Sequence, residues 1–182
     1  ARVPIEIDMT DENYSKYKIH CLAADIKNED YSAYIAIIPG GFLAEIYEQY
    51  GARLLEQNVR TFLQFGNSKS VNTGIRKTIK ETPHMFLAYN NGLAATADNI
   101  DLSEDGCVTR LSNLQIVNGG QTTASIYHTW KKDSADLSNI FVQAKISVVK
   151  RQEEYSTIVS DISRFSNTQN KVNSADFSSN NP

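Results

Sequence analysis

Cysteine and histidine are scarce in this chain of 182 residues, which has two cysteines and three histidines. Cys21 and Cys107 lie far apart and outside any CxxC spacing, a pattern that argues against a zinc site and against a disulfide framework. Both cysteines are therefore expected to be reduced residues of strands, as is usual for a protein of the cytoplasm.

Long apolar runs are also missing, since none approaches the roughly 20 residues that a membrane span needs. The first residues, Ala1 to Pro4, do not form a signal peptide. The formal charge of −3 gives no strong global attraction to nucleic acid or to an anionic membrane, although it leaves room for a local basic patch. Because the chain begins without Met and ends in a polar tail, we expect a fragment of a longer protein.

The composition that remains, 41% hydrophobic and 21% charged, is typical of a globular protein. A chain of this length forms one domain, expected over 1–182, and buries about two-thirds of its unfolded surface. Apolar periodicity predicts an α+β (mixed α/β) fold, with about four helices on a mixed sheet and a central three-strand meander over 85–89, 93–102 and 107–117. Other strands are predicted over 17–26, 31–38, 58–65 and 140–149, and helices over 42–54, 70–81, 121–132 and from 155 onward.

A glycine pair marks the junction of a predicted strand and a predicted helix. The residues there are Asn118, Gly119, Gly120, Gln121, Thr122 and Thr123. Two glycines let a ligand approach the backbone closely, and the first N–H groups of a helix suit a phosphate or a carboxylate. Equally, Asn118 could be a helix N-cap and the glycines a tight corner. The segment matches neither GxGxxG nor GxxxxGK[ST], so neither nucleotide-binding fingerprint applies.

Two further segments are rich in carboxamides. Asn90-Asn91-Gly92 has the composition of a hairpin turn, but its side chains would also suit a base edge or a ribose. The run from Ser166 to Asn173 includes Asn167, Gln169, Asn170 and Lys171, and it predicts either a polar helix end or a binding strip.

Positive charge is concentrated between Arg60 and Lys80. This stretch contains Arg60, Lys69, Arg76, Lys77 and Lys80, and it has no Asp or Glu. A solvated helix face is the ordinary explanation. The functional alternative is contact with the phosphates of a nucleic acid, assigned to Arg60, Arg76, Lys77 and Lys80.

Catalytic patterns are weak. His20, His84 and His128 are scattered, and no serine or cysteine lies in a nucleophile elbow. Gln143-Ala144-Lys145 is similar to the acid-x-Lys strand of metal-dependent nucleases, but Gln143 stands where a carboxylate would hold the metal. The sequence therefore assigns no catalytic residue, metal ligand or cofactor, and any nuclease activity is expected to lie outside this segment.

Four blocks, in order along the chain, resemble the AIPR family of abortive-infection phage-resistance proteins. They are LLEQNVRTFLQ, NTGIRKTIKETPHMFLAYNNGLAATA, LQIVNGGQTTASIY and ISRFSNTQNKVNSADF. The resemblance covers Phe42 to Pro182 and implies a role in phage defence beside restriction-modification genes. It supplies no catalytic residue for these positions.

The strand-glycine-helix junction followed by NTQNKVN is more distantly similar to DGQHR-motif proteins and, through them, to the ParB/sulfiredoxin superfamily. That likeness implies a nucleotide phosphate at the helix start. Thr122 and Thr123 replace the basic pair of the motif, so charge would have to come from Arg60 or Lys171. The leading hypothesis is a nucleotide- or nucleic-acid-sensing module that contacts other domains of its protein, and the alternative is a scaffold or protein-interaction domain.

Overall fold

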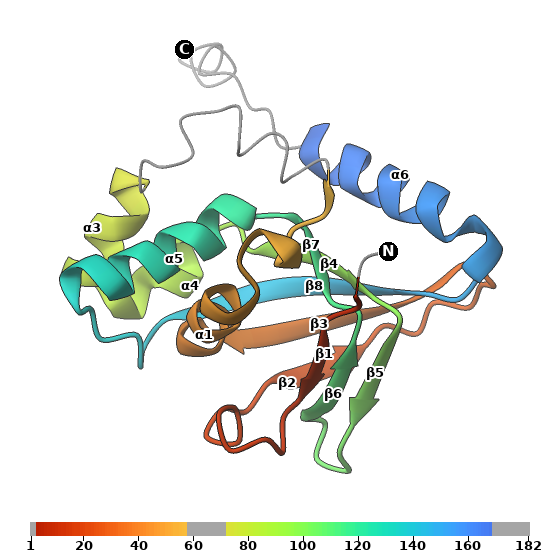
Figure 1. Cartoon of the computed structure of the whole chain (residues 1–182), viewed down its shortest axis with the longest axis horizontal. Coiled ribbons are helices and arrows are strands. Elements are labelled where there is room, and N and C mark those ends of the chain that lie inside the picture. The colour runs from red at the N-terminus through yellow and green to blue at the C-terminus, as the bar shows by residue number, and fades with distance from the viewer. Residues whose placement is uncertain (1–2, 58–71, 169–182) are drawn as a thin grey trace, which may run out of the picture.

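The computed structural model of the chain describes residues 3–57 and 72–168 (Figure 1). The predicted strand over 58–65, together with Arg60, Lys69, Gln169, Asn170 and Lys171, lies outside these residues. The mixture of helices with a mixed sheet confirms the predicted α+β class.

The larger sheet has five strands in the order β2-β3-β8-β4-β7. Its strands are β2 (His20–Ala23), β3 (Tyr31–Pro39), β8 (Phe141–Val149), β4 (Leu93–Ala97) and β7 (Gln115–Asn118). Only β4 and β8 run parallel, and every other neighbouring pair is antiparallel. Buried and exposed side chains alternate along the first part of β8, as a sheet with one covered and one open face requires.

A smaller antiparallel sheet contains β1 (Glu6–Asp8), β6 (Val108–Ser112) and β5 (Asn99–Leu102) in the order β1-β6-β5 (Figure 1). The strands predicted over 93–102 and 107–117 are therefore each divided between the two sheets. The second division falls at Asn113, whose φ of 52° lies in the left-handed region, where Asn is well tolerated.

The segment predicted as the first strand of the meander is helical, so the meander prediction is wrong there. It contains the short 3₁₀ turn η2 (Pro83–Met85) and the single helical turn α4 (Phe86–Tyr89). Pro83 occupies the first helical position, where a missing N–H costs nothing. Phe86 is the one buried residue of α4, so a single side chain anchors this turn to the core. The other residues of the turn are also apolar, and this composition is equally typical of a strand.

The remaining helical elements lie close to their predicted positions. They are α1 (Gly40–Tyr50), η1 (Gly51–Leu54), α3 (Thr73–Glu81), α5 (Gly120–Asp133), η3 (Gln152–Glu154) and α6 (Tyr155–Thr168). The helix predicted over 42–54 changes to 3₁₀ at Gly51, which has a φ of 57°. None of the helices in the described ranges is long and apolar enough to cross a membrane.

The two faces of the larger sheet are covered by different helices. Apolar residues of α1 and α5, among them Phe42 and Ile126, join the main core with Ala36, Ile38 and Ala144 of the sheet. Val159 of α6 instead packs with Ala94, Val117 and Val149. These side chains lie on the side of the sheet opposite the main core. Lys145 of β8 points to that side, since its neighbour Ala144 belongs to the core. Ala94 pairs with Lys145, and Val149 lies four residues further along the same side of β8. Phe165, predicted on the inner stripe of α6, is 52% exposed, and Ser163 is buried.

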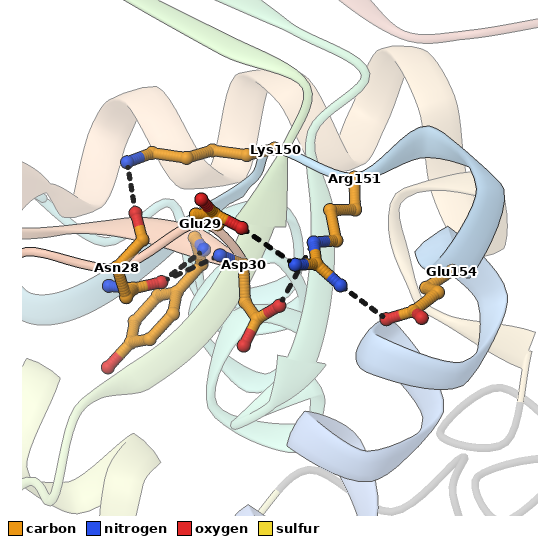
Figure 2. A network of polar contacts seen from close by, with 7 residues as sticks. Asn28, Glu29, Asp30, Lys150, Arg151 and Glu154 are labelled. Carbon is orange, nitrogen blue, oxygen red and sulfur yellow. Dashed lines mark hydrogen bonds and ion pairs between the residues drawn. The ribbon is translucent and has the colours of Figure 1, made fainter.

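A polar network fixes the start of α6 to the turn between β2 and β3 (Figure 2). Arg151 lies between Glu29, at 2.9 Å, Asp30, at 3.5 Å, and Glu154, at 3.8 Å. These acidic partners raise the pKa of Arg151, with the hydrogen bond to Glu29 as the largest cause. Lys150 Nζ donates to the carbonyl oxygen of Asn28 at 2.9 Å. The network joins segments that are about 120 residues apart.

Two tyrosines beside α1 predict a loss of stability in alkali. Burial is the main cause that raises the pKa of Tyr14 from 10.0 to about 12, and burial also raises the pKa of Tyr17. The Tyr14 hydroxyl also donates a short hydrogen bond to Gln49. Because the unfolded chain ionises first, stability is complete below pH 10 and falls as the pH rises to about 12. In urea titrations at stepwise pH, Tyr14→Phe should weaken this fall, whereas Tyr89→Phe, at a 64% exposed position, should leave it unchanged.

Candidate functional site: the β7–α5 corner

The corner between β7 and α5 is closed by Gly119. Its φ of 87° and ψ of 14° place it in the left-handed region. A Cβ built on Gly119 would lie 2.6 Å from Leu93 Cδ2 and 2.9 Å from the carbonyl oxygen of Gly92. Both the backbone angle and the close approach of β4 therefore require glycine. Gly119 itself is the N-cap residue of α5, so the alternative of Asn118 as the N-cap is wrong, and no side chain in the described ranges caps this end.

Asn90-Asn91-Gly92 lies beside Gly119, but it is not a hairpin turn. The segment links α4 to β4, so the hairpin prediction is corrected. Asn90 Oδ1 accepts a hydrogen bond from the N–H of Gly92 at 2.8 Å, and Asn90 Nδ2 donates to Thr122 Oγ1 at 3.3 Å. One carboxamide thus shapes its own loop and contacts the first turn of α5.

The end of α6 forms the third side of the corner. Asn118 Nδ2 donates to the carbonyl oxygen of Ser166 at 2.8 Å. Asn167 Nδ2 donates to the carbonyl oxygens of Val117, at 3.0 Å, and Ser163, at 2.7 Å. The structure therefore brings together the described parts of the three segments that the sequence singled out, and it does so through hydrogen bonds made by the asparagines themselves.

The polar groups of the corner differ in their access to solvent. Thr122 and Thr123 are buried, at 8% and 0% exposure, and Thr123 Oγ1 donates to the carbonyl oxygen of Gly119 at 3.5 Å. Gln121 and Asn91 are exposed. Solvent therefore reaches these two carboxamide side chains more readily than the threonine hydroxyls.

Glu56 is a polar residue of this region that sequence reasoning missed. It is only 8% exposed, and its carboxylate accepts a hydrogen bond from Ser163 Oγ at 3.3 Å. The Ser163 hydroxyl also lies 3.5 Å from the carbonyl oxygen of Val117. A charged residue directly after Leu54 and Leu55 was the available signal, because burial next to apolar residues requires such a carboxylate to be paired. Its negative charge disfavours a phosphate on this side of β7 unless a cation compensates for it.

The cations of α3 lie along α5 and away from the corner. Arg76 forms a two-point ion pair with Asp133 in the last turn of α5, at 2.7 and 2.8 Å, and Lys80 Nζ is 4.0 Å from the same carboxylate. The hydrogen bond from Arg76 is the main cause that lowers the pKa of Asp133. Lys77 is exposed. A surface cavity of about 270 Å³ beside this pair includes Lys80, Asp133 and Asp136 in its lining, a balance that does not favour a phosphate.

The described histidines and the strand residues Gln143 and Lys145 do not form a catalytic group at the corner. His128 packs against Tyr47 and Tyr127, and His20 Nδ1 lies 3.6 Å from Cys107 Sγ at the edge of the sheet. Gln143 and Lys145 occupy the exposed side of β8. Within residues 3–57 and 72–168, no group of three or more His, Cys, Asp or Glu side chains is arranged to hold a metal ion.

The described residues define an α+β domain with two sheets and a glycine corner where three distant segments meet. The sequence profile described as AIPR protein matches residues 55–182, which is well over half of the chain. The chain therefore belongs to the AIPR family, and the resemblance read from its four blocks is confirmed. The family places it among abortive-infection proteins of phage defence. No curated protein and no solved structure matches the chain.

Proposed function

We propose that this domain is a nucleotide- or nucleic-acid-sensing module of a phage-defence protein, with the phosphate at the N-terminal end of α5. The observation that carries the proposal is the meeting of the Asn90, Asn118 and Asn167 segments around the left-handed Gly119. Unpaired N–H groups at a helix start attract anions, and no side chain of residues 3–57 or 72–168 caps that end of α5.

In this proposal Gln121 and Asn91 supply the exposed hydrogen-bonding groups beside the phosphate. The hydrogen-bonded asparagines Asn90, Asn118 and Asn167 hold the loops in place and do not contact the ligand. The distant likeness to DGQHR-motif and ParB/sulfiredoxin proteins supports the same position for the phosphate. Lys77 is the α3 cation for contact with a nucleic-acid backbone, because Arg76 and Lys80 both lie against Asp133.

The test is a calorimetric titration of the chain with nucleoside triphosphates and with short DNA and RNA duplexes, using Gln121→Glu as the variant. A carboxylate at the start of a helix favours the fold but repels a phosphate. Saturable binding by the wild type should therefore weaken about tenfold or more in the variant, equivalent to about 1.4 kcal/mol. Thermal unfolding should be unchanged or slightly raised, which separates a loss of binding from a loss of fold.

Gln152→Glu is the matched control, because it makes the same change of charge at an exposed residue of η3. It should bind like the wild type. If no nucleotide or duplex gives saturable binding, or if Gln121→Glu binds as tightly as the wild type, the proposal is wrong.

A second candidate function is a scaffold or protein-interaction domain of a restriction-modification-linked system. The observation that favours it is the use of the Asn118 and Asn167 carboxamides, which donate to main-chain carbonyls within the fold. On this alternative, Asn118→Ala lowers stability by about 1 kcal/mol, the typical net value of one hydrogen bond, and affects no nucleotide binding.

A further inference from the structure

One face of the larger sheet exposes a group of apolar side chains on three adjacent strands. In the register, Leu22 of β2 pairs with Ile35 of β3, and Ile35 pairs with Lys145 of β8. Ile37 pairs with Gln143, and Pro39 with Phe141. Directly paired residues point to the same side of a sheet. We call the side formed by His20, Leu22, Ile35, Ile37, Pro39, Phe141, Gln143 and Lys145 the open face.

The apolar residues of the open face, on the edge strand β2 and on its neighbours β3 and β8, are strongly exposed to solvent. Their exposed fractions are 75% for Leu22, 41% for Ile35, 43% for Ile37 and 36% for Phe141. The opposite side of the same strands packs into the main core through Cys21, Ala36, Ile38 and Ala144. A contiguous apolar patch on an otherwise polar surface indicates a site of interaction with another molecule.

A helix already covers the neighbouring part of this side. Val159 of α6 packs with Val149, Ala94 and Val117, and Val149 lies on the same side of β8 as Lys145. On this side of the sheet, α6 therefore covers β7, β4 and the end of β8, but it does not cover β2, β3 or the first half of β8. Neighbouring strands lie about 4.8 Å apart, so three strands span about 10 Å, which is the width of a single helix.

The lysine on the open face indicates which charge a binding partner would place there. Lys145 lies beside Ile35 and forms no ion pair with any other described residue. The open face has no Asp or Glu. A second copy packed face to face would bring a second lysine and no carboxylate, so self-association would leave both charges unpaired in an apolar contact.

We propose that the open face docks an amphipathic helix of a protein partner, with a carboxylate of that helix placed over Lys145. The apolar stripe of the helix would cover Leu22, Ile35, Ile37 and Phe141 and would continue the layer that α6 begins. This mode of recognition, a helix laid on an apolar surface, takes its affinity from buried area and its orientation from the charge pair. It does not depend on phosphate binding at the β7–α5 corner.

The test uses two labelled synthetic helical peptides, identical in their leucine stripe, that carry either Glu or Lys at one central position of it. Fluorescence anisotropy with the intact chain should show the Glu peptide binding about tenfold more tightly, the effect of about 1.4 kcal/mol from one charge pair. Lys145→Glu should reverse the preference. Ile37→Asp should abolish the binding of both peptides, whereas Leu102→Asp, at an exposed apolar site of β5, should leave binding unchanged.

Several results would overturn this inference. They are no binding of either peptide, equal binding of the two, or the same preference after Lys145→Glu. Binding of a single-stranded oligonucleotide that is lost in both Ile37→Asp and Lys145→Glu would assign the open face to nucleic acid instead. A concentration-dependent dimer that Ile37→Asp dissociates would assign it to self-association. Circular dichroism of each variant confirms that the sheet is intact.

Discussion

Phe42→Ala is expected to lower the free energy of unfolding by about 3–5 kcal/mol, the range for truncation of a buried phenylalanine. Phe42 is fully buried at the start of α1, and its ring meets the rings of Tyr14 at 5.5 Å and Tyr17 at 6.0 Å, both edge to face. The substitution would remove these contacts and leave a cavity between α1 and the sheet. Urea unfolding followed by circular dichroism measures the change.

Val3→Ala is the control for this prediction. Val3 is 69% exposed, so its truncation should change stability by no more than about 0.5 kcal/mol. A loss below about 1 kcal/mol in Phe42→Ala would mean that the region around α1 is not packed as described.

Gly92→Ala should destabilise the chain by roughly 2–5 kcal/mol. Gly92 has a φ of 87°, and a Cβ there would lie 2.5 Å from the carbonyl oxygen of Gln143, which is main chain and cannot rotate away. The left-handed angle costs roughly 1–2 kcal/mol and the overpacking roughly 1–3 kcal/mol. The same clash would push β4 away from β8 at the residue next to Gly119, so any binding at the corner should weaken in parallel.

Gly106→Ala separates the two contributions to this loss. Gly106 has a similar φ of 81°, but a Cβ there would meet its nearest neighbour, the carbonyl oxygen of Cys21, at an ordinary 3.5 Å. Only the cost of the backbone angle should appear, and equal losses in the two variants would contradict the close contact with Gln143. Chemical denaturation of both variants under the same conditions gives the comparison.

Periodicity in the sequence predicted the elements whose burial follows one face. The alternation in Phe141–Val149 and the helical spacing in Tyr155–Thr168 each determine one buried side, so these elements appear where expected. It failed at Phe86–Tyr89, where four apolar residues fit a strand or a helical turn equally well. It also failed at Asn113, where the chain passes from β6 in the smaller sheet to β7 in the larger one. This division depends on which strands pair after folding, and the local sequence pattern contains no information about that pairing.

The contact between three segments of the candidate site is visible in the structure, but its hydrogen bonds were not predictable from the sequence. Glycine and asparagine composition singled out these segments, and the structure brings their described parts into contact. The Asn118 carboxamide donates to the carbonyl oxygen of Ser166, and the Asn167 carboxamide donates to that of Val117. These bonds join two segments that lie side by side only after folding, so the sequence does not reveal them. Glu56 was missed for the same reason, since its hydrogen-bond partner Ser163 lies 107 positions away. Whether the corner binds phosphate remains a prediction.

The pairing of β3 with β8 has a consequence for where this protein can be cut. All nine residues of β3 pair with β8, yet β3 lies entirely before Leu55, where the AIPR match begins. A truncated chain that starts at Leu55 would lose β1, β2, β3 and α1 together, and β8 would become a bare edge with unsatisfied N–H and C=O groups, which promotes aggregation. The stretch that defines the family is thus shorter than the stretch that builds its sheet, and expression trials should retain the first 54 residues.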